Sequence, residues 1–383
     1  MKKDKIIIVT HTAISKDMEI SGPAHTIFTY LKQKKSDVLF IRHSIYSDGK
    51  TYITLINDNN EENKQVNKNR WFGELSDRLS EGIITIASCM KSNSSDNRII
   101  YFGVDPLNTF WGILLKKIGK VDILITFNTD FAPRKYTNSL YNSLYFFLDN
   151  LSIRKADYII AVSHRIIAVR KKQGISEKKL IWLPNSPAVS HVKKFVLTHK
   201  DLYKLIMVST APFIDEFMIL INAVDALHKE FPSLQLTIIG SSKIEKQLNK
   251  EIENKKLKKH ITFLCAMSHD DVFKQIAKHG IGIAFYTNEI LDKYYLDSMK
   301  ARDYLALGTP VIISGDNGTV EYIIKSNAGV HIEATEKALI SALKMFFKHK
   351  DKYQQFSKNA FKLADLRDSE KVLNMIFKMI KVI

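Results

Sequence analysis

The chain has 383 residues, of which 45% are hydrophobic, and it carries a formal net charge of +17 at pH 7. This length favours two or three domains over one, and the hydrophobic fraction is typical of a globular protein with a sizeable core. No stretch approaches the roughly 18–20 uninterrupted apolar residues of a membrane-spanning helix. The two cysteines, Cys89 and Cys265, are too few for a disulfide framework or a thiolate metal site.

The apolar run at residues 6–9 is too short for a signal peptide, and charged residues follow it closely. We therefore expect a cytoplasmic protein. The positive charge has two interpretations. It attracts phosphate groups of nucleic acid, anionic lipids or lipid-linked diphosphates, or it reflects scattered lysines that serve solubility alone.

The first half of the chain alternates short β-branched runs with helical segments, which indicates a parallel sheet covered by helices. Strands are predicted at residues 5–10, 38–42, 98–102, 121–126 and 158–162, with residues 51–56 as one more. Helices are predicted at residues 24–34, 107–117 and 139–155. The polar segment 57–70 is predicted to be a surface excursion.

A second series of the same kind begins at residue 202. Strands are predicted at residues 204–209, 235–239, 261–264, 282–285 and 310–313, and helices at 215–230, 243–255, 269–279, 298–307 and 319–326. Two prolines in the sequence L-P-N-S-P (residues 183–187), followed by a polar stretch to residue 200, predict a linker between the two series. Residues 335–383 are predicted to be helical.

These patterns predict an α/β protein with two Rossmann-like parallel-sheet domains facing across a cleft, with helices at the C-terminus. Residues 1–187 form the first domain, 188–200 the linker and 201–365 the second domain, and a helix at 366–383 packs back on the first. Neither half has a G-x-G-x-x-G turn after its first strand, and there is no G-x-x-x-x-G-K-[ST] loop, which disfavours a standard dehydrogenase and a P-loop NTPase. Ligands of open parallel sheets bind beyond the carboxyl ends of the strands, so the cleft is the expected site.

Residues 294–315 place a lysine and an aspartate, Lys300 and Asp303, in the first turns of a predicted helix with Ser298 as its N-cap. A lysine at this end is unfavourable for the helix dipole unless an anionic ligand lies nearby. The alternative is an exposed pair of residues three apart, worth a few tenths of a kcal/mol at most.

The sequence M-K-A-R-D-Y-L-A-L-G-T-P-V-I at residues 299–312 resembles the K-x-x-E-Y-L-A-x-G-x-P-V-I signature of GT-B glycosyltransferases. The resemblance continues in D-N-G-T-V-E at 316–321, in the strand at 236–240 that ends in glycine, and in A-D-Y-I-I-A-V-S at 156–163 followed by L-P-N at 183–185. The order and spacing of these motifs match over most of the chain.

This resemblance implies that the second domain binds a nucleotide-diphosphate sugar and the first an acceptor. Asp303 takes the place of the glutamate that binds the nucleotide ribose, and Lys300 contacts the diphosphate or the sugar. Gly318 and Thr319 offer backbone amides to phosphate. The run D-S-M-K at 297–300 is also similar to bacterial β-glucuronosyltransferases of exopolysaccharide assembly, which implies that Tyr295, Ser298 and Met299 line the nucleotide site.

The chain departs from the family in two places. Many retaining members have two glutamates eight apart, but here the positions hold Tyr295 and Asp303. The usual arginine and lysine after the first strand of the second domain are missing from residues 209–216. The retaining mechanism is therefore in doubt, and an inverting one needs an acceptor-side base.

Asp130, after the strand at 121–126, is the preferred candidate for that base, with a turn or cap before Pro133 as its alternative role. Asp105 is a second candidate, with helix capping as its alternative role. His11 ends the first strand, and Gly22 and His25 open the first helix in a segment that resembles the family's glycine loop, so all three are expected at the acceptor side of the cleft. For His11, the alternative is a structural role. Gly-Pro is also simply good helix-start chemistry.

The expected activity is transfer of a hexosyl or glucuronosyl group, without a metal or other cofactor, to a glycan acceptor in cell-surface polysaccharide biosynthesis. A lipid-linked acceptor would explain the aromatic residues at 136–148 and the positive charge, and would place the protein on the cytoplasmic membrane face; a helix face that belongs to the core is the other explanation. Two other functions remain open: a nucleotide-sugar epimerase of the same fold, and a basic nucleic-acid-binding protein, although the lysines are dispersed.

Overall fold

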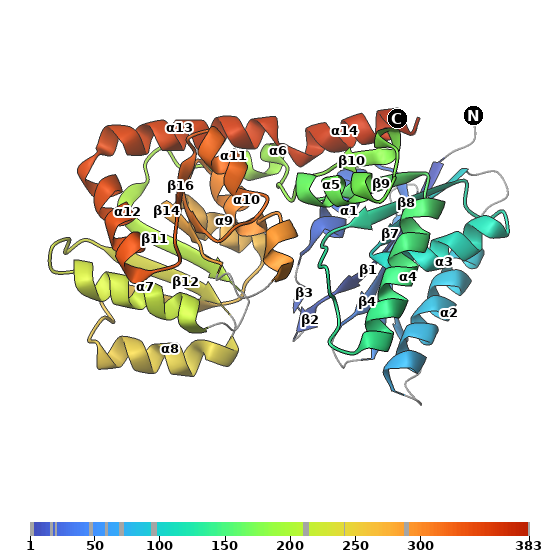
Figure 1. The fold of residues 1–383 in the computed structure, drawn as a ribbon, viewed down its shortest axis with the longest axis horizontal. Coiled ribbons are helices and arrows are strands. Elements are labelled where there is room, and N and C mark those ends of the chain that lie inside the picture. Colours follow the sequence, from blue (N-terminus) through green and yellow to red (C-terminus); the bar gives the residue numbers. More distant parts are fainter. Residues whose placement is uncertain are drawn as a thin grey trace. The chain divides into compact units, whose positions relative to one another are not determined.

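The computed structural model describes residues 4–15, 18–19, 21–45, 49–57, 60–68, 73–92, 98–209, 214–240, 242–286 and 291–381. The chain forms two compact units (Figure 1). Unit 1 comprises Met1–Leu183 and Val372–Ile383, and unit 2 comprises Pro184–Lys371. No helix in the described part of the chain is long and apolar enough to cross a membrane.

Unit 1 contains an eight-stranded sheet in the order β10-β9-β8-β7-β1-β4-β5-β6. Its strands are β1 (Asp4–Thr12), β4 (Asp37–Ser44), β5 (Lys50–Asn57), β6 (Asn60–Asn67), β7 (Arg98–Val104), β8 (Ile123–Asn128), β9 (Tyr158–Ala161) and β10 (Leu180–Trp182). β5 and β6 are antiparallel to their neighbours, and the other pairs are parallel. The short strands β2 (Ile14–Ser15) and β3 (Met18–Glu19) pair separately.

The helices of unit 1 are α1 (Pro23–Gln33), α2 (Glu74–Ser92), α3 (Pro106–Lys117), α4 (Ser139–Lys155), α5 (His164–Lys172), η1 (Glu177–Lys179) and α14 (Ser369–Met379), of which α14 begins in unit 2. α3 packs against both α2 and α4, and the three form one layer of the unit (Figure 1). β1 is buried on both faces, as expected of a central parallel strand, and its odd-numbered residues Ile7 and Val9 pack in the cluster under α2 and α3. Phe377 of α14 stacks on Tyr30 of α1 and contacts Phe102 of β7.

Unit 2 contains a six-stranded parallel sheet in the order β13-β12-β11-β14-β15-β16. Its strands are β11 (Asp201–Ser209), β12 (Gln235–Gly240), β13 (Ile261–Cys265), β14 (His279–Ala284), β15 (Val311–Ser314) and β16 (Gly329–Ile332). Its helices are α6 (Val189–Val192), η2 (Lys193–Phe195), α7 (Ile214–Leu227), α8 (Ser242–Asn254), α9 (His269–Ala277), η3 (Leu291–Tyr295), α10 (Met299–Ala306), α11 (Val320–Lys325), α12 (Glu336–Lys348) and α13 (Lys350–Leu366).

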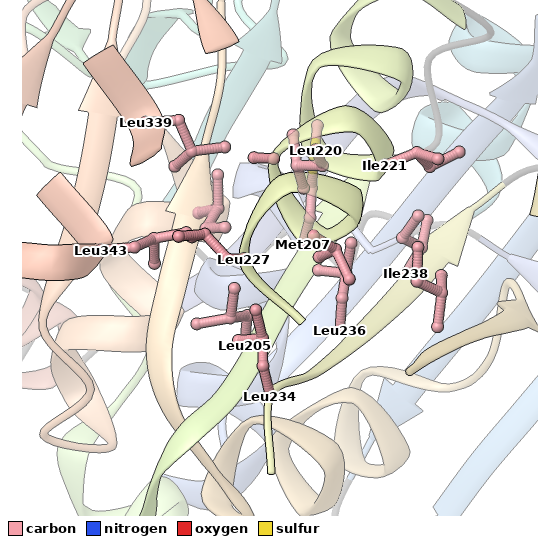
Figure 2. Close-up of a cluster of buried hydrophobic side chains, with 14 of the residues drawn as sticks. Leu205, Met207, Leu220, Ile221, Leu227, Leu234, Leu236, Ile238, Leu339 and Leu343 are labelled. Atoms are coloured by element: carbon pink, nitrogen blue, oxygen red, sulfur yellow. The ribbon is translucent and has the colours of Figure 1, made fainter. Parts of the chain in front are cut away.

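One core of unit 2 lies between the sheet and the helices α7 and α12 (Figure 2). Leu220 and Leu227 of α7 lie above β11 and β12, and Leu339 and Leu343 of α12 complete the cluster. Each of these side chains is at most 1% exposed, so this burial contributes roughly 1.5–3 kcal/mol per leucine to folding. The amphipathic spacing of both helices thus fixes them on the sheet.

The fold class predicted from the sequence is confirmed: both units are parallel-sheet α/β structures, with helices at the C-terminal end. The surface excursion predicted at 57–70 was wrong, because residues 60–67 form the edge strand β6. Its side chains are almost all exposed, so it shows no alternation of polar and apolar residues. The helix α2 was not predicted.

The boundaries between units differ from the predicted domain ends. Residues 188–200, predicted to be a linker, lie within unit 2, where Val192 is buried in a core cluster. Lys200 donates from Nζ to Leu307 O at 2.6 Å and so caps the C-terminal end of α10. The polar stretch therefore packs as part of the second unit, and the return to unit 1 comes at Val372 rather than at 366.

Candidate functional site

The start of α10 is held by buried polar contacts at the carboxyl ends of β14 and β15. Ser298 is the N-cap, and its Oγ accepts from Ala301 N at 3.2 Å, as predicted. The same Oγ lies 2.5 Å from Tyr286 Oη, and Ser298 N donates to Thr319 Oγ1 at 2.7 Å. Ser298 and Thr319 are both fully buried. Their hydroxyls therefore fix the local structure rather than line an open surface.

Asp297 is the hub of this region and was not among the predicted site residues. It is 1% exposed and accepts from Arg302 Nη2 at 2.7 Å and from Thr319 Oγ1 at 2.9 Å. It also accepts from Asn185 N at 2.7 Å, while Asn185 Nδ2 donates to Asp297 O at 2.9 Å. A buried carboxylate with these partners anchors the loop that leads into α10.

Gly318 and Thr319 were expected to offer backbone amides to phosphate. In the structure Gly318 N donates to Leu296 O at 3.0 Å, and Thr319 N donates to Asn317 Oδ1 at 3.0 Å. Both amides therefore already have acceptors within the protein. This arrangement argues against a phosphate contact through either amide, because a ligand would have to replace an existing hydrogen bond.

Lys300 lies at the first turn of α10 with its Nζ 4.5 Å from the centroid of the Tyr286 ring. Nearby, Lys293 Nζ forms an ion pair with the buried Glu216 at 3.2 Å. Burial lowers the pKa of Lys300 to about 8, Glu216 opposes this decrease and Lys293 adds to it. Two ammonium groups thus share one buried carboxylate, a charge arrangement that favours an anionic ligand.

Asp303 lies one turn farther along α10 and is only 6% exposed. Its Oδ2 pairs with His269 Nε2 of α9 at 2.8 Å, and the described residues provide no hydrogen bond to its Oδ1. Burial alone would lower the pKa of His269, but the charge of Asp303 and this hydrogen bond outweigh it, and the pKa is raised. Asp303 thus has one engaged oxygen and one that can accept from a ligand hydroxyl.

Two other predicted donor-site residues flank Lys300. Tyr295 ends η3 and packs edge-to-face on Tyr294, with ring centroids 4.9 Å apart. Met299 is the first residue of α10 and is half-buried. Met299 and Lys300 thus share the first turn of α10 with Asp303 one turn on, whereas Tyr295 belongs to the preceding helix η3. Residues 210–213, half of the stretch that lacks the family's basic residues, lie outside the described part of the chain.

Unit 1 has its own charged cluster, at the carboxyl ends of β1 and β7. His11 Nδ1 lies 2.8 Å from Asp105 Oδ2, and His11 Nε2 lies 3.0 Å from Glu81 Oε2. Asp105 is also the N-cap of α3, where its Oδ1 accepts from Asn108 N at 3.0 Å. Its φ of 76° is the strained left-handed region, which a non-glycine residue occupies at a cost of order 1–3 kcal/mol. Asp105 is therefore both the predicted cap and a partner of His11.

Glu81, the second carboxylate on His11, also pairs with a buried lysine. Lys68 Nζ lies 2.9 Å from Glu81 Oε1 and 3.2 Å from Asp77 Oδ2, and its side chain is fully buried. Arg78 Nη1 contacts Glu81 Oε2 at 3.1 Å and His11 Nε2 at 2.9 Å. With Asp105, the cluster has three carboxylates and, besides His11, two cations. Charge balance therefore favours a protonated His11.

The titration behaviour of the two histidines in this region follows their partners. Burial lowers the pKa of His11, but the charge and hydrogen bond of Asp105 and the contact with Glu81 outweigh it and raise the pKa to about 9. Among the described residues, the ring of His43, opposite His11 on β4, has the hydroxyls of Thr51 and Thr85 as its hydrogen-bond partners. Its burial, with the positive charge of His11, lowers its pKa to about 3. One imidazole is thus held charged and its neighbour neutral.

The remaining predicted acceptor-side residues lie elsewhere in unit 1. Asp130 follows β8, is ion-paired with Lys135 at 2.5 Å, and its side chain is 53% exposed. It does not cap α4, whose N-cap is Asn138. Gly22 and His25 form the start of α1, where Gly22 N donates to His25 Nδ1 at 3.0 Å. Part of the predicted glycine loop, residues 16, 17 and 20, lies outside the described part of the chain.

The described partners of His25 are consistent with the structural role of a helix cap. His25 Nε2 pairs with Glu19 at 2.8 Å, and Glu19 also pairs with Arg42 at 2.8 Å. Burial raises the pKa of Glu19, but the hydrogen bond from His25 and the charge of Arg42 outweigh it and lower the pKa. Neither Glu19 nor Arg42 was among the predicted site residues: Glu19 lies a few positions before the predicted helix, and Arg42 comes from the separate strand β4.

Comparison with known proteins identifies the fold. Residues 191–363 match the family model for glycosyl transferases group 1. No curated protein sequence matches the chain. Among solved structures, sucrose-phosphate synthase from Thermosynechococcus elongatus is similar with a TM-score of 0.70 at 11% identity, covering 99% of this chain and 99% of that one.

Two further structures are similar over nearly the whole chain. HepE of Anabaena, solved in complex with UDP, is similar with a TM-score of 0.65 at 14% identity, covering 99% of this chain and 100% of that one. A UDP-N-acetylglucosamine 2-epimerase is similar with a TM-score of 0.62 at 13% identity, covering 98% and 96%. The resemblance found in the sequence is confirmed at the level of the fold: the chain has the fold of the GT-B glycosyltransferases, and its residues 191–363 match the family model for glycosyl transferases group 1.

Proposed function

We propose that the chain transfers a sugar from a nucleotide-diphosphate sugar, bound by unit 2, to a glycan acceptor bound by unit 1. The observation that supports this most is the start of α10, where Lys293 pairs with the buried Glu216, Lys300 lies within reach of the charges of both, and Asp303 lies one turn away. The bound UDP of HepE, a protein of the same fold, supports a nucleoside diphosphate as the ligand.

The roles proposed for these groups follow from their charges. Lys300 and Lys293 neutralise the pyrophosphate, and as the bond to the sugar breaks they stabilise the charge that develops on the leaving diphosphate. Asp303, oriented by His269, accepts hydrogen bonds from the ribose hydroxyls. Because two lysines provide this positive charge, we propose transfer of a hexosyl or glucuronosyl group without a metal ion or other cofactor.

On the acceptor side, two candidates for the base that takes the acceptor hydroxyl proton are distinguishable. Asp130 is exposed and can reach solvent, and its carboxylate is ion-paired with Lys135. His11 is oriented by Asp105, as a general base requires, but its pKa of about 9 keeps it protonated near neutral pH. A His11 mechanism therefore predicts a transfer rate that rises about tenfold per pH unit up to about pH 9, whereas an Asp130 mechanism predicts no such rise.

We place the acceptor in the class of lipid-linked glycans of cell-surface polysaccharide biosynthesis, with the protein on the cytoplasmic membrane face. The support is the positive charge and the aromatic segment 136–148 noted in the sequence. This part of the proposal is tested separately from sugar transfer, through the lipid-binding experiment described below.

The experiment for the donor is a thermal-shift screen of sugar nucleotides, followed by mass spectrometry of the product formed with a glycan acceptor. We expect stabilisation by one or a few nucleotide-diphosphate sugars, and its loss in Lys300→Ala. Lys325→Ala on α11 is a matched control, since that side chain is 77% exposed and far along the chain from α10. Equal stabilisation of both variants would contradict the proposed donor site.

A second candidate function is epimerisation of a nucleotide sugar, because a UDP-N-acetylglucosamine 2-epimerase shares the fold. This reaction needs no acceptor. Incubation of the protein with the sugar nucleotide alone separates the two functions: an isomerised sugar nucleotide indicates an epimerase, and an unchanged one together with transfer to an added glycan indicates a transferase.

A further inference from the structure

The outer side of the α2–α3–α4 layer in unit 1 is unusually apolar. On α2, Leu79, Ile83 and Met90 are exposed, and Ile83 is 69% exposed. On α4, three more large apolar side chains are exposed: Leu140 (74%), Leu144 (49%) and Phe147 (62%). Here "apolar layer" denotes these six residues together with Ile118, Tyr136 and Tyr141, which are also exposed.

Both helices repeat one pattern. Residues 79, 83, 86 and 90 on α2, and residues 140, 144, 147 and 151 on α4, follow the spacing i, i+4, i+7 and i+11, which places each set on one face of its helix. Ile86 and Leu151 at the third and last positions are half-buried. The exposed faces therefore carry continuous aliphatic and aromatic stripes.

The buried faces of the same helices carry polar groups. On α2 the inward residues include Asp77, Glu81 and Thr85, and on α4 they include Asp149 and Ser152. Apolar side chains are also buried on these helices, Cys89 on α2 and Ile153 on α4, so both helices carry large apolar residues on the exposed side in addition to the core side. A surface of this kind on two helices that both pack against α3 (Figure 1) indicates an interaction site.

The charges at this surface favour one kind of partner. The acids of α2, α3 and α4 with described side chains are Asp77, Glu81 and Asp149, and all three are buried. The exposed charged residues at the helix ends are instead basic: Lys91, Lys117, Arg154 and Lys155. All four lie in the last turns of their helices, and basic residues at one end of an apolar face match the chemistry of an anionic lipid surface, with headgroups at the basic end and acyl chains against the apolar side chains.

We infer that the apolar layer of α2 and α4 docks unit 1 on a membrane that contains anionic lipids. A second copy of the chain fits less well, because a symmetric contact through this layer would bring like-charged lysines and arginines together. The inference deepens the proposed function, since a lipid-linked acceptor would be met at such a surface. It does not depend on any sugar chemistry, and vesicle binding is measured without donor or acceptor.

The test is co-sedimentation of the full chain with vesicles of phosphatidylglycerol and phosphatidylcholine, compared with vesicles of phosphatidylcholine alone. We expect binding to the anionic vesicles that weakens with salt, and much weaker binding to the neutral ones. Leu144→Glu on α4 and Ile83→Glu on α2 should each reduce binding at least tenfold. The matched control is Leu366→Glu in unit 2, where the leucine is 67% exposed and lies outside the apolar layer, and its binding should equal that of the original chain.

Three outcomes would overturn the inference: equal binding to both kinds of vesicle, an equal loss in Leu366→Glu, or no vesicle binding together with a dimer that Leu144→Glu dissociates in sedimentation analysis. The last outcome would assign the surface to a second copy of the chain. Thermal shift with the sugar nucleotide, measured on the same variants, separates this question from the donor site. A variant that keeps its donor-induced shift but loses vesicle binding has lost only the membrane contact.

Discussion

The charge of His11 provides the most direct test of the unit 1 cluster. Its pKa of about 9, against an ordinary value of 6.5, corresponds to about 3 kcal/mol of stabilisation at 1.36 kcal/mol per unit. Because the pKa is raised in the folded state, this stability is fully present below about pH 6.5. It is lost as the pH rises through about 9.

The perturbation is Glu81→Gln, which keeps the shape of the side chain and removes one of the two carboxylates on the His11 ring. Asp105 makes the larger contribution to the raised pKa of His11, so we expect the variant's pKa to fall by about 1 unit. Glu81→Gln also removes a partner of the buried Lys68, at a cost of roughly 3 kcal/mol. Asp77→Asn is the matched control, because it removes the other carboxylate on Lys68 without touching His11.

The assay is an NMR titration of the histidine ring protons between pH 5 and pH 10, with His11→Asn used to assign the His11 signal. We expect His11 to titrate near pH 9 in the original chain and in Asp77→Asn, and about one unit lower in Glu81→Gln. An ordinary pKa near 6.5 in the original chain, or equal shifts in the two variants, would refute the claim that Asp105 and Glu81 raise the pKa of His11. Should Glu81→Gln fail to fold, Asp105→Asn removes the other carboxylate on the His11 ring and leaves the ion pairs of Lys68 intact.

Three other changes test the donor site, the base and the fold. Lys300→Ala should weaken the binding of UDP about tenfold or more. In the original chain the affinity for UDP, measured by calorimetry, should fall between pH 7 and pH 9, because Lys300 loses its proton at a pKa of about 8. An affinity that does not change with pH would exclude Lys300 as a phosphate contact. Asp130→Asn should abolish turnover while donor affinity stays unchanged, and near-normal transfer would eliminate Asp130 as the base. Gly308→Ala should lower the free energy of unfolding by about 1–2 kcal/mol, since Gly308 has a φ of 69° and a Cβ there would lie 2.1 Å from the Phe361 ring; urea denaturation measures this loss, and an unchanged midpoint would show that the backbone relaxes.

The elements that the sequence predicts well are those with strong local signals. The strand β1 is a run of β-branched residues, and α4 begins at a good N-cap, Asn138. α10 begins at Ser298 and stops at Gly308, whose positive φ suits the residue type. In each case the determining residues lie within a few positions of the element.

The helix α2 was missed although its apolar residues at 79, 83, 86 and 90 follow helical spacing. Its buried side holds a charged network, which sequence analysis did not assign to a helix. The acids Asp77 and Glu81, four apart, were the available signal, but their partner Lys68 and the ring of His11 come from other elements. A contact between residues 70 positions apart, as in His11 and Glu81, cannot be predicted from local spacing.

In the donor site too, contacts between distant positions could not be predicted from local spacing. The motif placed Lys300 and Asp303 on one helix, and the structure confirms that helix. It does not reveal that Asp297 is tied to Asn185, 112 positions away, or that Asp303 is paired with His269 of another helix. Family resemblance locates the turn, whereas the hydrogen-bonding partners depend on tertiary packing.

The discontinuity of unit 1 has a consequence for biosynthesis. Its core includes Leu373, Ile376 and Phe377, all fully buried, yet the ribosome makes these residues only after the whole of unit 2. Until then, Tyr30 and Phe102 lack their aromatic partner, so the nascent first unit exposes apolar surface throughout the synthesis of the second. A fragment that stops at residue 183 should therefore aggregate or recruit chaperones, and fusing residues 372–381 to it through a flexible tether should restore its solubility.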